Sequence, residues 1–186
     1  MENDLLPPAV SDAGPLIHLA QVSKLLLLKK IFKHVSITPK VKEEVVDEGV
    51  RFSHMDALAV KKAIDEGWII VKSIPGATVL VAKRLAKGEN LSLADAETLL
   101  LAKEKGAEIL VDEKPLSDLA KMYGLKVWNT WTILLEALRK GFIEVSDIES
   151  AVIELGEKRH KLKPKQATEI LEAAKLISHT YTSLHT

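Results

Sequence analysis

Cysteine is absent from this chain of 186 residues. Its absence excludes disulfide bonds, thiolate zinc sites and cysteine nucleophiles, and it fits a reducing compartment. An excess of charge of one sign is also missing, because 26 basic and 26 acidic residues cancel. A neutral protein has no overall field that gathers nucleic acid, so any such binding depends on local basic clusters.

Long apolar runs are missing as well. No run approaches the roughly 18–20 residues that span a bilayer, so the sequence predicts no membrane partner. The first residues, MENDLLPP, lack a basic segment followed by an apolar one, and we therefore expect a cytoplasmic protein. With 47% apolar and 28% charged residues, the composition is typical of a soluble globular protein with one substantial core.

Several common catalytic motifs do not occur. The sequence contains neither a GxxxxGK[ST] phosphate loop nor a GxGxxG loop, and no serine lies in a GxSxG turn. The six histidines are scattered without the spacing of a zinc site. Only His18, in an apolar helical pattern near Asp12, is expected to border a site, and a structural role is the simpler interpretation of it.

The stretch AVSDAGPLIHLA, residues 9–20, organises the rest of the chain. A short apolar run reaches Asp12, the chain turns at Gly14 and Pro15, and a helical apolar pattern follows. An acid at the end of a buried strand is costly unless something pairs with it. Asp12 is therefore either a cap of the following helix or the anchor of a metal site, and the metal site is our working hypothesis.

Strand and helix patterns alternate along the chain, which favours an α/β fold with a parallel sheet. Strands are expected at 8–10, 35–37, 68–71, 107–112 and 125–128. Helices are expected at 22–32, 39–48, 52–66, 79–86, 92–105, 116–123, 129–139, 147–157 and 164–178, with Gly88 ending the fourth. We expect one domain over residues 1–145 and a helical extension over residues 146–186, packed on it or next to it.

Four acids are placed where they can meet. Ligands of open α/β sheets bind beyond the carboxyl ends of the strands, and Asp12 and Asp112 each follow an apolar strand pattern. Asp95 begins a helix, where it forms a capping-box pattern with Ser92. Glu44 lies among valines and is expected to turn inward. Several carboxylates this close cannot all stay ionised without cations, and hard ions such as Mg²⁺ or Mn²⁺ prefer oxygen ligands.

Each of these acids also has a simpler interpretation. Asp95 is explained as an ordinary residue of a first helical turn, and Glu44 as a solvated member of the acidic run EEVVDE. Asp12 and Asp112 are both explained as helix caps. The metal-site hypothesis rests on all four acids occurring in this order and context.

The order of these segments resembles the PIN-domain family, and within it a prokaryotic branch related to the VapC-like toxin ribonucleases. The resemblance spans most of residues 9–143 and is carried by VSDAGPLIHLA, ITPKVKEEVV, LSLADAETLLLA and ILVDEKPLSDLAKMYGLKVWNT. It implies a PIN-like three-layer α/β/α fold with a central, mainly parallel sheet of four to five strands, followed by C-terminal helices.

The resemblance also implies a site and an activity. It makes one acidic quartet both catalytic and metal-binding, with three accessory residues nearby. The quartet is Asp12, Glu44, Asp95 and Asp112, and the accessory residues are Glu97, Asp118 and Thr130. The implied enzyme is a Mg²⁺- or Mn²⁺-dependent phosphodiester hydrolase, a single-strand-preferring endoribonuclease. The implied partners are RNA or another single-stranded nucleic acid, an antitoxin protein and a second copy of the chain in a homodimer.

One departure and two alternatives accompany this resemblance. Many family members carry Ser or Thr after the first acid, whereas Ala13 stands here and removes a hydroxyl from the surroundings of the metal. A catalytically weak regulatory module that binds nucleic acid or protein is one alternative, with the C-terminal helices as its partner or dimer surface. A phospho-receiver-like domain is the other, and it ranks lower because an adjacent pair of acids is missing at Asp12.

A substrate-binding rim of basic residues is also expected. The candidates are Lys83, Arg84 and Lys87, then Lys114, and finally the run at 158–161, KRHK. Each of these clusters is equally explained as a solvated surface.

Overall fold

The computed structural model describes residues 6–48, 55–158 and 162–184, and its centre is a sheet of five parallel strands. The strands are β1 (Ala9–Ser11), β2 (Val35–Ile37), β3 (Ile69–Val71), β4 (Glu108–Leu110) and β5 (Val127–Trp128). Their order across the sheet is β3-β2-β1-β4-β5, and every neighbouring pair is parallel. The three central strands are almost wholly buried, as a parallel sheet covered on both faces requires.

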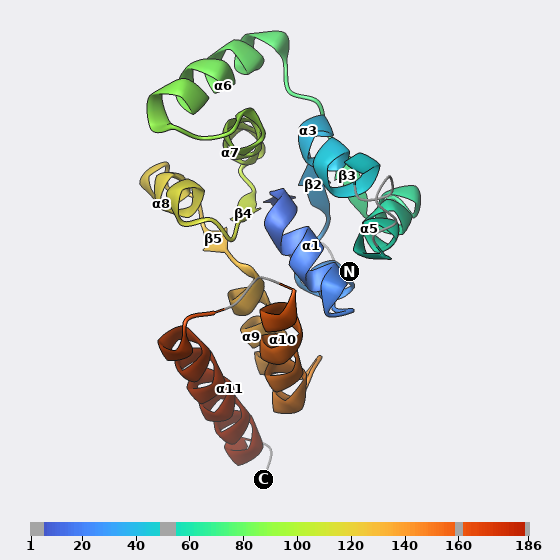
Figure 1. Ribbon diagram of the computed structural model, residues 1–186, viewed down its shortest axis with the longest axis vertical. Coiled ribbons are helices and arrows are strands. Elements are labelled where there is room, and N and C mark those ends of the chain that lie inside the picture. The colour runs from blue at the N-terminus through green and yellow to red at the C-terminus, as the bar shows by residue number, and fades with distance from the viewer. Residues whose placement is uncertain (1–5, 49–54, 159–161, 185–186) are drawn as a thin grey trace.

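Helices cover both faces of this sheet. Those before β4 are α1 (Ala13–Gln21), α2 (Leu27–Ile31), α3 (Pro39–Lys42), the π-helical η2 (Glu43–Glu48), α5 (Met55–Asp65), α6 (Gly76–Glu89) and α7 (Leu93–Lys105). Those after it are α8 (Lys114–Met122), α9 (Thr130–Arg139), α10 (Val145–Glu157) and α11 (Pro164–Leu184). Figure 1 shows α9, α10 and α11 grouped at one end of the molecule and α6 at the other.

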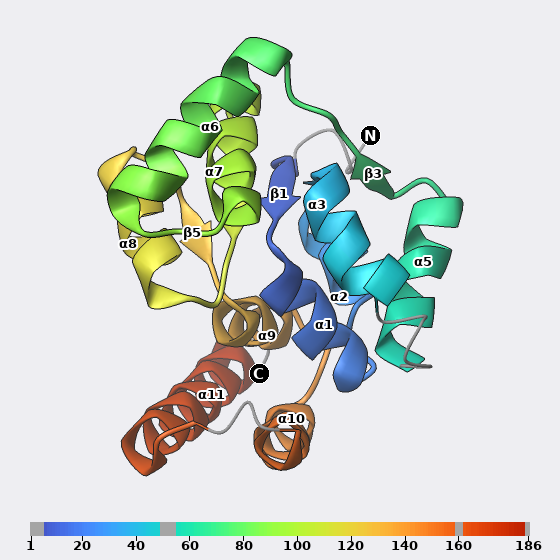
Figure 2. The same cartoon turned by 45° about the horizontal axis from the view of Figure 1, so that its top comes forward.

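The alternation of side chains along each strand separates two apolar cores. Ala9 and Leu110 point into the larger core, which they share with the helices α1, α2, α5 and α9. Val10 and Ile109 point into the smaller core, which α7 and α8 complete. Figure 2 shows α7 and α8 on one side of β1 and α5 on the other. The predicted three-layer α/β/α fold is therefore confirmed, with five strands that are all parallel.

Several predicted boundaries differ from the structure, and two of these differences have a clear cause in the backbone. The single helix expected at 22–32 is only the short α2, because the chain breaks at Ser23, which has a left-handed φ of 56°. Gly88 does not end its helix. The chain continues to Glu89, and Asn90 takes the left-handed cap conformation while its N–H donates to Ala86 O. Asparagine tolerates that conformation, so it ends the helix in place of the glycine.

The C-terminal helices share the larger core. Ile148, Ala151 and Leu155 of α10 and Ala174 of α11 are buried in it, and Lys24 Nζ lies 2.6 Å from Asp147 Oδ1 at the start of α10. The division into residues 1–145 and 146–186 remains a prediction. No helix within the described ranges combines the length and the hydropathy that a membrane crossing requires.

Candidate functional site

The topology of the sheet creates a switch point beside β1. The chain adds β2 and β3 on one side of β1 and then crosses over to add β4 and β5 on the other. In open α/β sheets the crevice at such a point, beyond the carboxyl ends of the strands, is where ligands bind. Asp12 directly follows β1, and its backbone N–H donates to Leu110 O of β4 at 2.9 Å. Asp12 and Asp112 therefore lie at the same edge of the sheet, beyond neighbouring strands.

Asp12 is buried, with 7% of its surface exposed. It occupies the N-cap position of α1, but its side chain makes no capping hydrogen bond, and Pro15 offers no N–H in the first turn. The pKa of Asp12 is raised from 3.8 to about 7. Burial is the largest cause, the negative charges of Asp95, Glu44 and Glu113 add to it, and the Ala13 amide opposes them in part. A conventional helix cap does not explain this side chain.

Asp112 has the opposite environment. Its Oδ2 accepts a hydrogen bond from His18 Nδ1 at 2.6 Å and another from Thr130 Oγ1 at 2.7 Å, and its Oδ1 accepts one from the Thr130 amide at 2.7 Å. Burial by itself would raise the pKa of Asp112, but these hydrogen bonds outweigh burial and hold the pKa below its ordinary value. The cap of α8 is Glu113, so Asp112 does not cap the helix that follows it in sequence.

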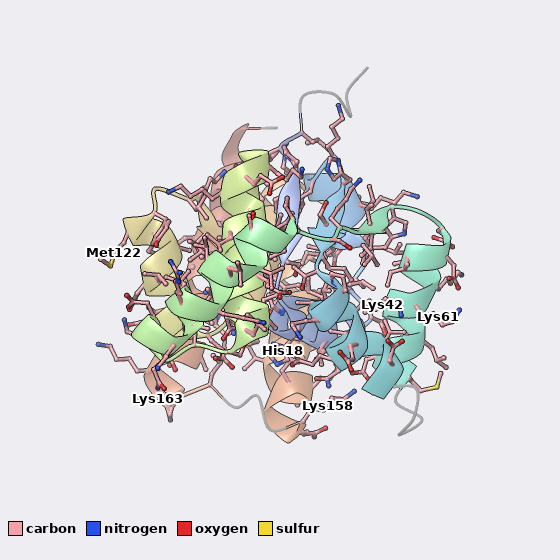
Figure 3. All side chains as sticks on the ribbon, turned by 90° about the horizontal axis from the view of Figure 1, so that it is seen from above. His18, Lys42, Lys61, Met122, Lys158 and Lys163 are labelled. Carbon is pink, nitrogen blue, oxygen red and sulfur yellow. The ribbon has the colours of Figure 1, made fainter. Side chains whose placement is uncertain are left out.

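The backbone of α1 also approaches Asp112 closely. A Cβ added to Gly14 would lie 3.3 Å from Asp112 Oδ2 and 3.4 Å from Asp112 Cβ. Gly14 and His18 are one helical turn apart, so the same face of α1 presents both of them to Asp112. Figure 3 shows His18 at the inner part of the molecule, whereas Lys61, Met122 and Lys163 stand at its periphery.

Asp95 and Glu44 contribute charge to this site from two further helices. The predicted capping box is present: Ser92 N donates to Asp95 Oδ2 and Asp95 N donates to Ser92 Oγ, both at 3.0 Å. Asp95 therefore completes the capping box of α7, whose N-cap is Ser92, and its charge also acts on Asp12. Glu44 is exposed, so the expectation that it turns inward was wrong, although its charge still reaches Asp12.

The accessory residues differ from one another. Thr130 is buried and bonds Asp112 twice, as described above. Glu97 is buried on α7 with 5% of its surface exposed. Asp118 lies on the exposed side of α8 in an ion pair with Lys114. The prediction omitted Glu113, which acts on Asp12, and its only sequence signal was its place directly after Asp112.

The carboxylate oxygens at this site are the type of ligand that hard divalent cations prefer. Carboxylates gather around the buried Asp12, and an incoming cation would relieve their mutual repulsion. Thr98 lies one turn after Asp95 on α7, and its buried hydroxyl has no hydrogen-bond partner in the described structure. A buried hydroxyl without a protein partner is explained by a bound water or ion. Within the described ranges, no three acidic or histidine side chains already enclose one point, so binding an ion requires side chains to rotate.

A pocket of about 870 Å³ lies elsewhere. None of the four predicted acids or three accessory residues lines it. Its wall is mainly apolar and includes Leu25, Leu26 and Trp68, with Lys62 and Lys158 also among its residues.

Comparisons with known proteins agree with the fold. The crystal structure of PAE2754 from Pyrobaculum aerophilum is 18% identical, covers 70% of this chain and 88% of its own, and has a TM-score of 0.52. A PilT N-terminus domain protein, SSO1118 from the hyperthermophilic archaeon Sulfolobus solfataricus P2, is 19% identical with coverages of 70% and 93% and a TM-score of 0.46. No curated protein matches the chain.

A family model described as DUF3368: PIN domain matches residues 8–176. This match runs through all five strands, the four predicted acids and both C-terminal helices up to the later part of α11. The chain therefore belongs to the DUF3368 family of PIN domains.

Proposed function

We propose that this protein is a Mg²⁺- or Mn²⁺-dependent endoribonuclease that cuts single-stranded RNA. The PIN domain is generally a metal-dependent nuclease fold. The observation that carries the proposal is the buried Asp12 at the switch point of the sheet, whose charge Asp95, Glu44 and Glu113 repel. At a buried position surrounded by other acids, a neutral side chain would stabilise the fold better than an acid does.

Four acids would hold the metal in this proposal. Asp12 supplies the buried oxygen at the centre, Asp95 and Glu44 approach from helices, and Asp112 offers an oxygen that neighbouring groups keep ionised. When bound, the ion would polarise the phosphodiester and lower the pKa of a bound water. The protein itself supplies the fixed orientation of these carboxylates and the exclusion of bulk water around Asp12.

The same proposal assigns substrate binding to the second half of α6. Lys83, Arg84 and Lys87 are exposed and make no ion pair within the described residues. The α6 helix runs against α7, and a short link joins the end of α6 to the start of α7, so this basic end lies near Asp95. Cations there would neutralise phosphates of a strand that enters the site. Lys114 is less suited because it pairs with Asp118, and residues 159–161 lie outside the described residues.

The resemblance to VapC-like toxins extends the proposal to a toxin role, an antitoxin protein as partner and a homodimer. Light scattering on the purified chain tests the dimer directly. Co-purification with the product of a neighbouring small gene tests the antitoxin.

Hydrolysis of a labelled single-stranded RNA tests the main proposal. The wild type should cut it with Mn²⁺ or Mg²⁺ and stop cutting it in EDTA. Asp12→Asn and Asp112→Asn should each lower the rate by at least about 100-fold, the upper end of the cost of losing an indirect support of a metal site. Asp65→Asn is the matched control, because Asp65 is exposed on α5 and pairs only with Lys61 among the described contacts.

Activity that survives in Asp12→Asn, or that EDTA leaves unchanged, would contradict the proposal and indicate a contaminating nuclease. Metal-independent RNA binding without hydrolysis by the wild type would favour a regulatory module. Single-stranded DNA and duplex RNA of the same sequence, run alongside, measure the preference for single-stranded RNA.

A further inference from the structure

His18 connects the two acids at the ends of β1 and β4. Asp12 begins α1, and His18 lies in the last turn of the same helix. Its ring is mostly buried, with 17% of the side chain exposed, and its Nδ1 reaches Asp112, which is 94 positions away in sequence. An ionised carboxylate only accepts hydrogen bonds, so Nδ1 must carry the proton in this contact.

The contacts of Asp112 fill one oxygen and leave room on the other. A carboxylate has about two acceptor positions on each oxygen. His18 Nδ1–H and Thr130 Oγ1–H occupy both positions of Oδ2, whereas among the described residues only the Thr130 amide bonds Oδ1. One acceptor position therefore remains, and it is on Oδ1.

The backbone of α1 further restricts access of an ion to Oδ2 of Asp112. The carboxylate lies so near to Gly14 that even a methyl group there would touch Oδ2 at 3.3 Å. An ion could not approach Oδ2 past Gly14, His18 and Thr130 without breaking hydrogen bonds to a charged group, which are stronger than those to a neutral one.

We propose that His18 is a positioning residue that saturates Oδ2 of Asp112 and thereby makes this acid a one-oxygen metal ligand through Oδ1. The inference rests on the proposed function, in which Asp112 binds the metal. Without the Nδ1–H, Oδ2 regains a free position and the carboxylate can turn about its Cβ–Cγ bond. The orientation of Oδ1 is then held by Thr130 alone, and metal affinity falls while all four acids remain.

A matched pair of substitutions tests this role. His18→Asn places an amide N–H where Nδ1 stands, and His18→Leu has a side chain of similar shape without a donor. Calorimetry with Mn²⁺ on the full chain should show a dissociation constant 10- to 100-fold weaker for His18→Leu, the usual cost of losing an indirect support. His18→Asn should stay within about threefold of the wild type, because the donor is restored.

Thermal unfolding in EDTA, measured on the same samples, separates this role from a purely structural one. Equal Mn²⁺ affinity in His18→Leu and the wild type would overturn the inference while the proposed function stands. Equal weakening in both variants would also overturn it, because the donor would then be irrelevant. A wild type that binds no Mn²⁺ would overturn the inference and the proposed function together.

A measurement on the wild type covers the case in which His18→Leu does not fold. Nitrogen-15 spectra of histidine-labelled protein report which ring nitrogen carries the proton. We expect a protonated Nδ1 on His18 with and without saturating Mg²⁺. An unprotonated Nδ1, or loss of the Nδ1–H signal when Mg²⁺ binds, would overturn the inference.

Discussion

Replacement of Asp12 by asparagine should stabilise the metal-free protein at neutral and alkaline pH. Asp12 is 7% exposed, and burial disfavours its charged form before any neighbour is considered. The charges of Asp95, Glu44 and Glu113 add to that cost. Asparagine has nearly the same shape and never ionises, so it removes the cost while filling the same space.

The magnitude follows from the pKa. A rise from 3.8 to about 7 corresponds to about 4 kcal/mol, at about 1.4 kcal/mol for each pH unit. Between these two pH values the folded protein holds a proton on Asp12 that the unfolded chain has released. The free energy of unfolding of the wild type therefore falls as pH rises from about 4 to about 7, and this loss is complete above pH 7. Asp12→Asn should lack this fall.

Urea unfolding in EDTA at several pH values between 4 and 8 measures the difference. At pH 8 the variant should be about 4 kcal/mol more stable than the wild type, and its melting temperature should be roughly 8–16 °C higher. At pH 4 the two should differ little. Asp65→Asn should follow the wild type, because Asp65 lies in an exposed ion pair. If Asp12→Asn and the wild type show parallel pH dependences, Asp12 is not the buried, repelled acid described above.

Three further predictions concern the surroundings of the site. Thr130→Val removes one hydrogen bond to the ionised Asp112 and should cost about 1.5–3 kcal/mol in urea unfolding at pH 7. Because the pKa of Asp112 is lowered, that cost should disappear as pH falls through the pKa and the acid is protonated in either protein. Ser92→Ala breaks the capping box of α7 and should cost about 1 kcal/mol in the same assay, and a change below about 0.3 kcal/mol would contradict the box. Lys87→Gln should reduce the salt dependence of binding to single-stranded RNA by about 0.7 in the log–log slope, and an unchanged slope in fluorescence titrations would exclude Lys87 from the phosphate path.

The sequence predicted the features that depend on neighbours in the chain. Ser92 and Asp95 form the expected capping box because both partners lie within one helical turn. The apolar runs before Asp12 and near Asp112 form adjacent central strands, since only a strand buried on both faces tolerates such a run. The edge of the sheet on which these two acids meet follows from parallel topology alone.

Features that depend on contacts between residues far apart in the chain could not be predicted from the sequence. The bond between His18 and Asp112 joins positions 94 apart and needs β1 and β4 to be paired in the observed register. Glu44 was assigned to the inside from the valines around it, but the π-helical turn of η2 shifts the usual periodicity and leaves its side chain exposed. Local periodicity does not carry this information.

The two acids at the switch point share one edge of the sheet and have opposite pKa shifts. Asp112 is satisfied by three hydrogen bonds, so it remains ionised and fixed whether or not a cation is near. Asp12 receives no comparable support, and three other acids repel its charge. A fold selected only for stability would pair or neutralise Asp12, because its ionisation costs a large part of the roughly 5–15 kcal/mol that holds a domain together. Above pH 7, where Asp12 is ionised, a bound cation would offset that cost, and this is why we propose that Asp12 binds one.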